Sequence, residues 1–156
     1  MTQPILVVFD CTVFAQALIN PQGPAGSCLT ASQAGQLRLF VSDFVIREIY
    51  ELPQKLPARL RVTPERVLAL ILDLAKYTEP IDNVPEHFTY QRDPDDAHYV
   101  NLAEAAKATF LVSRDKDLLD LTNRDDFKSR FPNLRIMSPP QFLRELESAL
   151  SKAKPS

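Results

Sequence analysis

The sequence predicts an α/β fold in which helices cover both faces of a mostly parallel sheet. Short runs of consecutive apolar residues, typical of strands buried on both faces, recur along the chain. Between them lie segments whose apolar residues repeat at helical spacing, and this alternation is the pattern of a parallel sheet. The 156 residues, 45% of them hydrophobic, suffice for one domain with a substantial core. We therefore expect a single domain over residues 1–156, with a tail that frays after about residue 150.

The first part of the chain is predicted to hold two strands and two helices. Residues 5–9 are all apolar and form the first strand candidate. Apolar residues then recur at helical spacing over 13–18, and the Pro- and Gly-containing segment 20–24 ends that helix. A second helix is expected over residues 27–34, and a second strand over 37–41.

The middle of the chain continues this alternation. Ser42 is a candidate N-cap for a helix that reaches about residue 52, before Pro53. We expect this helix to bury four apolar residues: Val45, Ile46, Ile49 and Tyr50. Thr63 and the proline after it begin a helix over 64–77, followed by a weak strand over 78–81.

The last part of the chain is predicted to supply the remaining strands. A polar loop over residues 83–91 leads to a helix over 94–107. Residues 109–112 and 134–137 are the fourth and fifth strand candidates. The final helix is expected to start after Ser138 and to end near residue 150.

Composition excludes several functional classes. The net charge is −2, so the chain lacks the basic signature of a simple nucleic-acid-binding module. The chain has only three glycines and neither a P-loop nor a G-x-G-x-x-G motif, which disfavours a nucleotide cofactor. Two cysteines do not make a disulfide framework, and His87 and His98 lack partners at metal-ligand spacing. No apolar segment is long enough for a membrane span or a signal peptide, so we expect a cytoplasmic protein.

Acidic residues follow the strands and open the helices in four places. The residues are Asp10 after the first strand, Glu48 within a helix, Asp93, Asp95 and Asp96 at a helix start, and Asp115 and Asp117 after the fourth strand. Each has an ordinary structural explanation when it is taken alone. Asp10 and Asp117 can cap helices, Glu48 can be a solvated helix residue, and the acids near Pro94 suit the positive end of a helix.

Taken together, the acidic residues predict a metal site. A doubly wound sheet brings the ends of the first and fourth strands together, and these ends carry Asp10 and Asp115. Asp96 shares a helical face with Tyr99, which should point inward, so its carboxylate needs a partner. Gathered carboxylates repel one another unless a cation holds them, and Mg²⁺ or Mn²⁺ acting on phosphate is the expected combination.

Two of these stretches also resemble a known family. The segments Arg92-Asp93-Pro94-Asp95-Asp96 and Arg114-Asp115-Lys116-Asp117-Leu118-Leu119, in this order after Asp10 and after Ser42 with Glu48, resemble the PIN domain family. The similarity is greatest to its VapC-like branch, the toxin components of toxin–antitoxin systems. It extends over residues 5–143, and the segments at 20–24 and 138–143 also resemble that branch.

The resemblance implies a three-layer α/β/α fold and a metal-dependent ribonuclease that uses Mg²⁺ or Mn²⁺. It implies catalytic roles for Asp10, Glu48, Asp96 and Asp115, with Asp10, Asp96, Asp115 and Asp117 as metal ligands and Asp93 in support. The family usually has Asn or Ser where this chain has Thr12, whose hydroxyl can still donate a hydrogen bond to Asp10. Ser113 stands where the family usually has Ser or Thr, and its hydroxyl is expected to steady the same cluster.

These residues suggest a mechanism of phosphodiester hydrolysis. Asp10, Asp96 and Asp115 would hold a first metal ion, and Glu48, with Asp117, would orient water or help to hold a second. Single-stranded RNA is the substrate that the resemblance implies. Four cations next to the acidic motifs are candidate phosphate contacts, unless they only pair with adjacent acids: Arg47, Arg92, Arg114 and Lys116.

Two other functions stay open at this point. Residues 9–13 resemble the nucleophile loop of haloacid-dehalogenase-type phosphatases, although Thr12 stands where that family needs a second Asp. A catalytically weak PIN domain that binds RNA or a protein is the non-enzymatic alternative. As partners, the resemblance implies a small antitoxin protein and a second copy of the chain.

Overall fold

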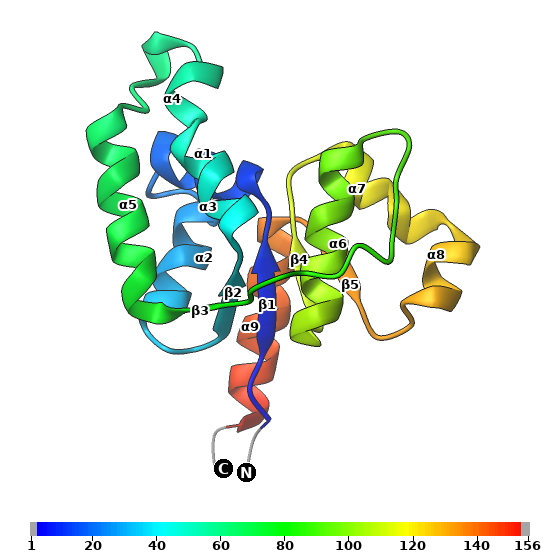
Figure 1. Ribbon diagram of the computed structural model, residues 1–156. Coiled ribbons are helices and arrows are strands. Elements are labelled where there is room, and N and C mark those ends of the chain that lie inside the picture. Colours follow the sequence, from blue (N-terminus) through cyan, green and yellow to red (C-terminus); the bar gives the residue numbers. More distant parts are fainter. Residues whose placement is uncertain (1–2, 154–156) are drawn as a thin grey trace.

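The computed structural model describes residues 3–153 and shows a five-stranded parallel sheet between two layers of helices (Figure 1). The strand order is β3-β2-β1-β4-β5, and all four pairings are parallel. The strands are β1 (Leu6–Phe9), β2 (Arg38–Val41), β3 (Thr78–Pro80), β4 (Phe110–Val112) and β5 (Arg135–Met137). The predicted three-layer α/β/α fold is thus confirmed, and each predicted strand is present.

The first strand lies at the centre of the sheet because it is the most apolar. β1 pairs with β2 on one side and with β4 on the other. Val7, Val8 and Phe9 are fully buried, as expected for a strand that is covered on both faces. This central position places the end of β1, and the acidic residue that follows it, in the middle of one sheet edge.

The helices of the first half are α1 (Cys11–Ile19), α2 (Pro24–Gln33), α3 (Asp43–Tyr50), α4 (Leu52–Lys55) and α5 (Pro64–Tyr77), with a 3₁₀ turn at Ala58–Leu60. The predicted break over residues 20–24 does end α1, at Ile19, but the second helix begins at Pro24 and not at residue 27. The helix predicted to reach about residue 52 ends at Tyr50, and α4 follows as a separate short helix. Pro24 and Pro53 lie in the first turn of α2 and of α4, where the missing amide proton costs nothing. Tyr50 is 65% exposed and is therefore not part of the buried stripe of α3, because it is rotated by one residue from the fully buried Ile49.

The helices of the second half are α6 (Pro94–Ala106), α7 (Lys116–Asp120), α8 (Asp125–Arg130) and α9 (Pro139–Ala153), with a 3₁₀ turn at Leu121–Asn123. The last helix, α9, ends at Ala153, three residues beyond the predicted end near residue 150; the rest of the predicted tail, residues 154–156, lies outside the described part. α6 packs across the central strands, whereas α1, α2 and α9 form the opposite layer (Figure 1). Within residues 3–153, no helix combines the length and apolar character that crossing a membrane requires.

Candidate metal centre

The carboxyl ends of β1 and β4 form the base of an acidic site. Phe9 pairs with Val112, and the Asp10 amide donates a hydrogen bond to the Val112 carbonyl oxygen at 3.0 Å. Asp10 and Ser113 therefore leave the sheet side by side, although they are far apart in the sequence. This is the edge at which parallel α/β sheets bind ligands.

Asp10 is held by hydrogen bonds to both of its carboxylate oxygens. The Thr12 hydroxyl and the Val13 amide donate to Oδ1, and the Ser113 hydroxyl donates to Oδ2. These two hydroxyls also accept hydrogen bonds from backbone amides, of Arg114 at 2.9 Å and of Asp115 at 2.8 Å. Asp10 is only 2% exposed, and burial raises its pKa to about 6 despite these donors. A buried, fully bonded carboxylate is poorly placed to act as a phosphatase nucleophile.

Four other carboxylates meet above this base. Asp93 and Asp96 at the start of α6, and Asp115 and Asp117 at the start of α7, can each offer one oxygen so that all four oxygens lie within 4.8 Å of one another. Asp93 and Asp115 are also helix N-caps, because one oxygen of each accepts an amide hydrogen bond, at 3.1 Å and 2.8 Å. The sequence motifs for capping and for metal binding thus coincide.

Asp96 shows that this cluster fits a cation. Its Oδ2 is buried and has no hydrogen-bond partner among residues 3–153. Burial, followed by the charges of Asp115, Asp93 and Asp10, raises the pKa of Asp96 to about 8. A hard divalent cation with oxygen ligands would satisfy the orphaned oxygen and offset the repulsion. The donor set of four carboxylates is the kind that Mg²⁺ and Mn²⁺ prefer.

The structure brings three of the four predicted metal ligands into this group, together with Asp93, which was predicted as a supporting residue. Asp10 lies outside the group, although its charge contributes to the raised pKa of Asp96. Both oxygens of Asp10 are hydrogen-bonded, so its part as a direct ligand stays a prediction.

Glu48 approaches the site from α3 through a buried tyrosine. The Tyr99 hydroxyl donates to the Glu48 carboxylate and accepts a hydrogen bond from the Cys11 amide at 3.1 Å. Burial is the main reason that the pKa of Glu48 is raised. Tyr99 thus connects Glu48 to the turn that carries Asp10. The inward direction of Tyr99 was predictable from its helical face, but its two hydrogen-bond partners were not.

The four predicted phosphate contacts divide into two kinds. Arg92 forms ion pairs with Asp117 at 2.6 Å and with Asp120 at 2.9 Å, and the Arg114 side chain donates to Gln16 at 2.7 Å. All four are exposed, and within the described residues Arg47 and Lys116 form no salt bridge. Sequence reasoning missed Asp120 and also Tyr90, whose hydroxyl donates to the Asp117 carbonyl oxygen at 3.1 Å. Neither residue belongs to a motif. Only the fold reveals that Tyr90, through Asp117, and Asp120, through Arg92, connect the loop before α6 to α7.

Comparisons with known proteins agree with this arrangement. A family model described as "PIN domain" matches residues 6–117, which include every residue of the acidic cluster. The chain is 30% identical over 148 residues to an uncharacterised protein of Methanocaldococcus jannaschii, MJ1680. That match covers 94% of this chain and 95% of the archaeal protein.

Two solved structures are similar in fold. One is a chain in the crystal structure of VapBC2 from Rickettsia felis bound to a DNA fragment from their promoter, with a TM-score of 0.56 and 16% identity. The other is a chain in DNA-bound VapBC from Salmonella typhimurium, with a TM-score of 0.54 and 15% identity. Each alignment covers 86% of this chain and 98% of the other.

Proposed function

This chain belongs to the PIN domain family, and on that premise we propose that it is a Mg²⁺- or Mn²⁺-dependent nuclease that hydrolyses phosphodiester bonds in single-stranded RNA. The observation that supports this most directly is the orphaned, buried Oδ2 of Asp96 within a group of four carboxylates. Without a metal such a group is relieved only by binding a proton, whereas a divalent cation would satisfy the orphaned oxygen and offset the charge repulsion with all four carboxylates ionised.

In this proposal Asp96, Asp115, Asp117 and Asp93 hold the divalent cation. When bound, it would lower the pKa of a coordinated water and neutralise charge on the scissile phosphate. Asp10 holds the ends of β1 and β4 together through its hydrogen bonds with Thr12 and Ser113. Asp10 is also close enough to Asp96 for its charge to raise the pKa of Asp96.

The remaining groups position the reactants. In this proposal Glu48, whose carboxylate accepts a hydrogen bond from Tyr99, orients the attacking water by accepting a hydrogen bond from it. Arg92 lies beside Asp117 and is the cation best placed to contact a substrate phosphate next to the cluster. Arg114, Lys116 and Arg47 are proposed as further phosphate contacts on the rim.

Metal binding and cleavage test this function together. Bound Mn²⁺ should stabilise the folded protein by a free energy of RT ln(1 + [L]/Kd) and so raise its melting temperature. EDTA should reverse this increase. Cleavage of single-stranded RNA should require the metal and should be lost in Asp10→Asn and Asp96→Asn. Asp125→Asn, an exposed acid on α8, is the matched control and should keep both properties.

The outcomes also separate the alternatives. A Mn²⁺ shift without any cleavage of RNA would support the non-enzymatic PIN domain. If Mn²⁺ neither raises the melting temperature nor supports cleavage, the proposed metal centre is contradicted. A phosphorylated Asp10 would instead favour the phosphatase.

We also propose that the physiological partner is a small antitoxin protein, because the fold resembles chains of two VapBC complexes. A small open reading frame next to the gene, whose product relieves growth inhibition by this chain, is the expected finding. A chain that does not inhibit growth when expressed alone would contradict the toxin assignment. A homodimer stays a prediction.

A further inference from the structure

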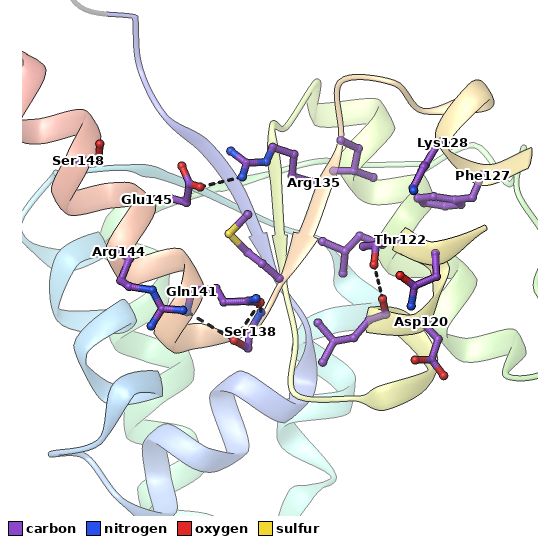
Figure 2. A pocket seen from close by; sticks show the side chains of 15 residues that line it. Asp120, Thr122, Phe127, Lys128, Arg135, Ser138, Gln141, Arg144, Glu145 and Ser148 are labelled. Carbon is purple, nitrogen blue, oxygen red and sulfur yellow. Dashed lines mark hydrogen bonds and ion pairs between the residues drawn. The ribbon is translucent and has the colours of Figure 1, made fainter. Parts of the chain in front are cut away.

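A large groove lies beside β5, the edge strand, which has no strand on its outer side within residues 3–153 (Figure 2). Its volume is about 1020 Å³. The whole of β5 lines its middle, α8 with the end of α7 and the 3₁₀ turn after it lines one side, and α9 lines the other. This volume reaches the upper end of the range for small-ligand pockets, about 300–1,000 Å³, so the groove can take more than one small group.

The charges in the groove leave an excess of positive charge. Asp120 is held by Arg92 at 2.9 Å, and Glu145 is held by Arg135 at 2.7 Å, so both lining carboxylates are already paired. The other two charged residues of the lining, Lys128 and Arg144, have no salt-bridge partner within the described residues. They come from α8 and α9, and Figure 2 shows them on opposite sides of β5. An anionic ligand that spans the groove would contact both.

The neutral lining suits a phosphate backbone. Asn123, Ser138, Gln141 and Ser148 provide amide and hydroxyl donors. Side chains of these types supply many of the contacts to phosphate and sugar in nucleic-acid complexes, and such contacts do not depend on the base.

The groove is linked to the metal centre in two ways, through the backbone of α7 and through a hydrogen bond between the ends of β4 and β5. α7 carries Asp117 in its first turn and ends at Asp120, which lines the groove. At the base, the Ser113 amide donates to the carbonyl oxygen of Met137 at 3.0 Å, and Met137 and the residue after it belong to the lining. An RNA strand bound at the carboxylates would therefore reach the groove within the length of α7.

We propose that this groove holds the single-stranded RNA on one side of the cleavage point, with phosphates bound by Lys128 and Arg144. The inference rests on the proposed nuclease function and adds the path of the substrate. It assigns a binding role to α8 and to the exposed side of α9, which lie outside the acidic motifs. Recognition in the groove is by charge and backbone shape, so it should tolerate any base sequence.

Binding of a fluorescently labelled oligouridine RNA to the Asp10→Asn protein, measured by anisotropy over a range of salt concentrations, tests the path. We expect Lys128→Ala and Arg144→Ala each to weaken binding and to lower the salt slope by about 0.7, the value for one phosphate contact on a single strand. Lys76→Ala and Arg59→Ala remove exposed cations of the same types from other elements and should leave the slope unchanged.

The possible failures are distinguishable. A wild-type protein that cuts RNA, combined with unchanged slopes in both groove variants, would overturn the path but not the nuclease. Equal losses in the control variants would also overturn it, because the effect would then be one of general charge. A wild-type protein that neither cuts nor binds RNA removes both proposals. Binding of an oligoglutamate peptide that depends on Lys128 and Arg144, without such dependence for RNA, would assign the groove to an acidic protein segment instead.

Discussion

Among the carboxylates of the described residues, Asp96 has the pKa that burial and neighbouring charge raise most. Its pKa is raised to about 8 by burial and by Asp115, Asp93 and Asp10, whereas an unfolded chain ionises Asp near 3.8. Between these two values the folded state binds a proton that the unfolded state has released. Stability therefore falls as the pH rises through this window. Asp10, with a pKa raised to about 6, acts in the same direction.

The expected fall in stability with rising pH can be tested directly. In EDTA, wild-type protein should be more stable at pH 5 than at pH 8, and Asp96→Asn should reduce the difference because the amide cannot ionise. At pH 8 the variant should gain about 1–3 kcal/mol over wild type, read from urea unfolding. Asp125→Asn should show the wild-type pH profile. A wild-type protein whose stability rises from pH 5 to pH 8 in EDTA would contradict the electrostatic account of the cluster.

Tyr99 gives the second prediction at this scale. Tyr99→Phe keeps the ring, which packs edge-on against Phe44 and His98, and removes only the hydroxyl, which donates to Glu48 and accepts from the Cys11 amide. We expect kcat for RNA cleavage to fall about 10- to 100-fold, as when a group that orients a catalytic residue is lost, with KM little changed. In a Glu48→Gln background the same change should have almost no further effect. Additive losses in the double variant would show that Tyr99 acts independently of Glu48.

At the scale of elements, α2 depends on a close approach that only glycine permits. A Cβ at Gly26 would lie 2.0 Å from the Pro21 carbonyl oxygen, which belongs to the turn between α1 and α2. Backbone atoms cannot move aside as a flexible side chain does. The turn and the helix therefore fit together only while this position lacks a side chain.

The third prediction follows from this contact. Gly26→Ala should destabilise the protein by about 1–3 kcal/mol, the usual cost of overpacking, despite the higher helix propensity of Ala. Ser27→Ala, at the next, exposed position of the same helix, should be neutral or slightly stabilising. Urea unfolding measures both. A stabilised Gly26→Ala protein would mean that the turn before α2 can move away.

The elements also show where sequence reasoning stops. Strands and long helices were predictable because their apolar periodicity extends over several turns or a whole strand. The short helix α8 has only one buried apolar residue, Phe127, and so produces no periodic signal. The start of α2 at Pro24 and the short helix α4 around Pro53 were not predicted, because proline ends one helix and begins another with equal ease, and only the path of the chain decides between them.

At the scale of the whole molecule, the site was predictable as far as topology determines it. Alternating strands and helices imply that the ends of β1 and β4 are neighbours, which brings Asp10 and Asp115 to one edge. The hydrogen bonds of Asp10 and the entry of Asp93 into the carboxylate group depend instead on side-chain rotamers and cap geometry. The groove beside β5 depends on how α8 and α9 sit on the sheet, and no sequence motif records it.

The central place of β1 has a consequence for synthesis. Asp10 emerges early from the ribosome, but one of the two hydroxyls that donate to it, that of Ser113, is 103 residues further along the chain. Contacts of such long range form only when both partners have been made. A nascent chain that ends before Asp115 therefore lacks two of the four carboxylates of the cluster. On the proposed function, the growing polypeptide cannot cut the messenger or ribosomal RNA beside it until the segment with Asp115 and Asp117 has been made and has folded.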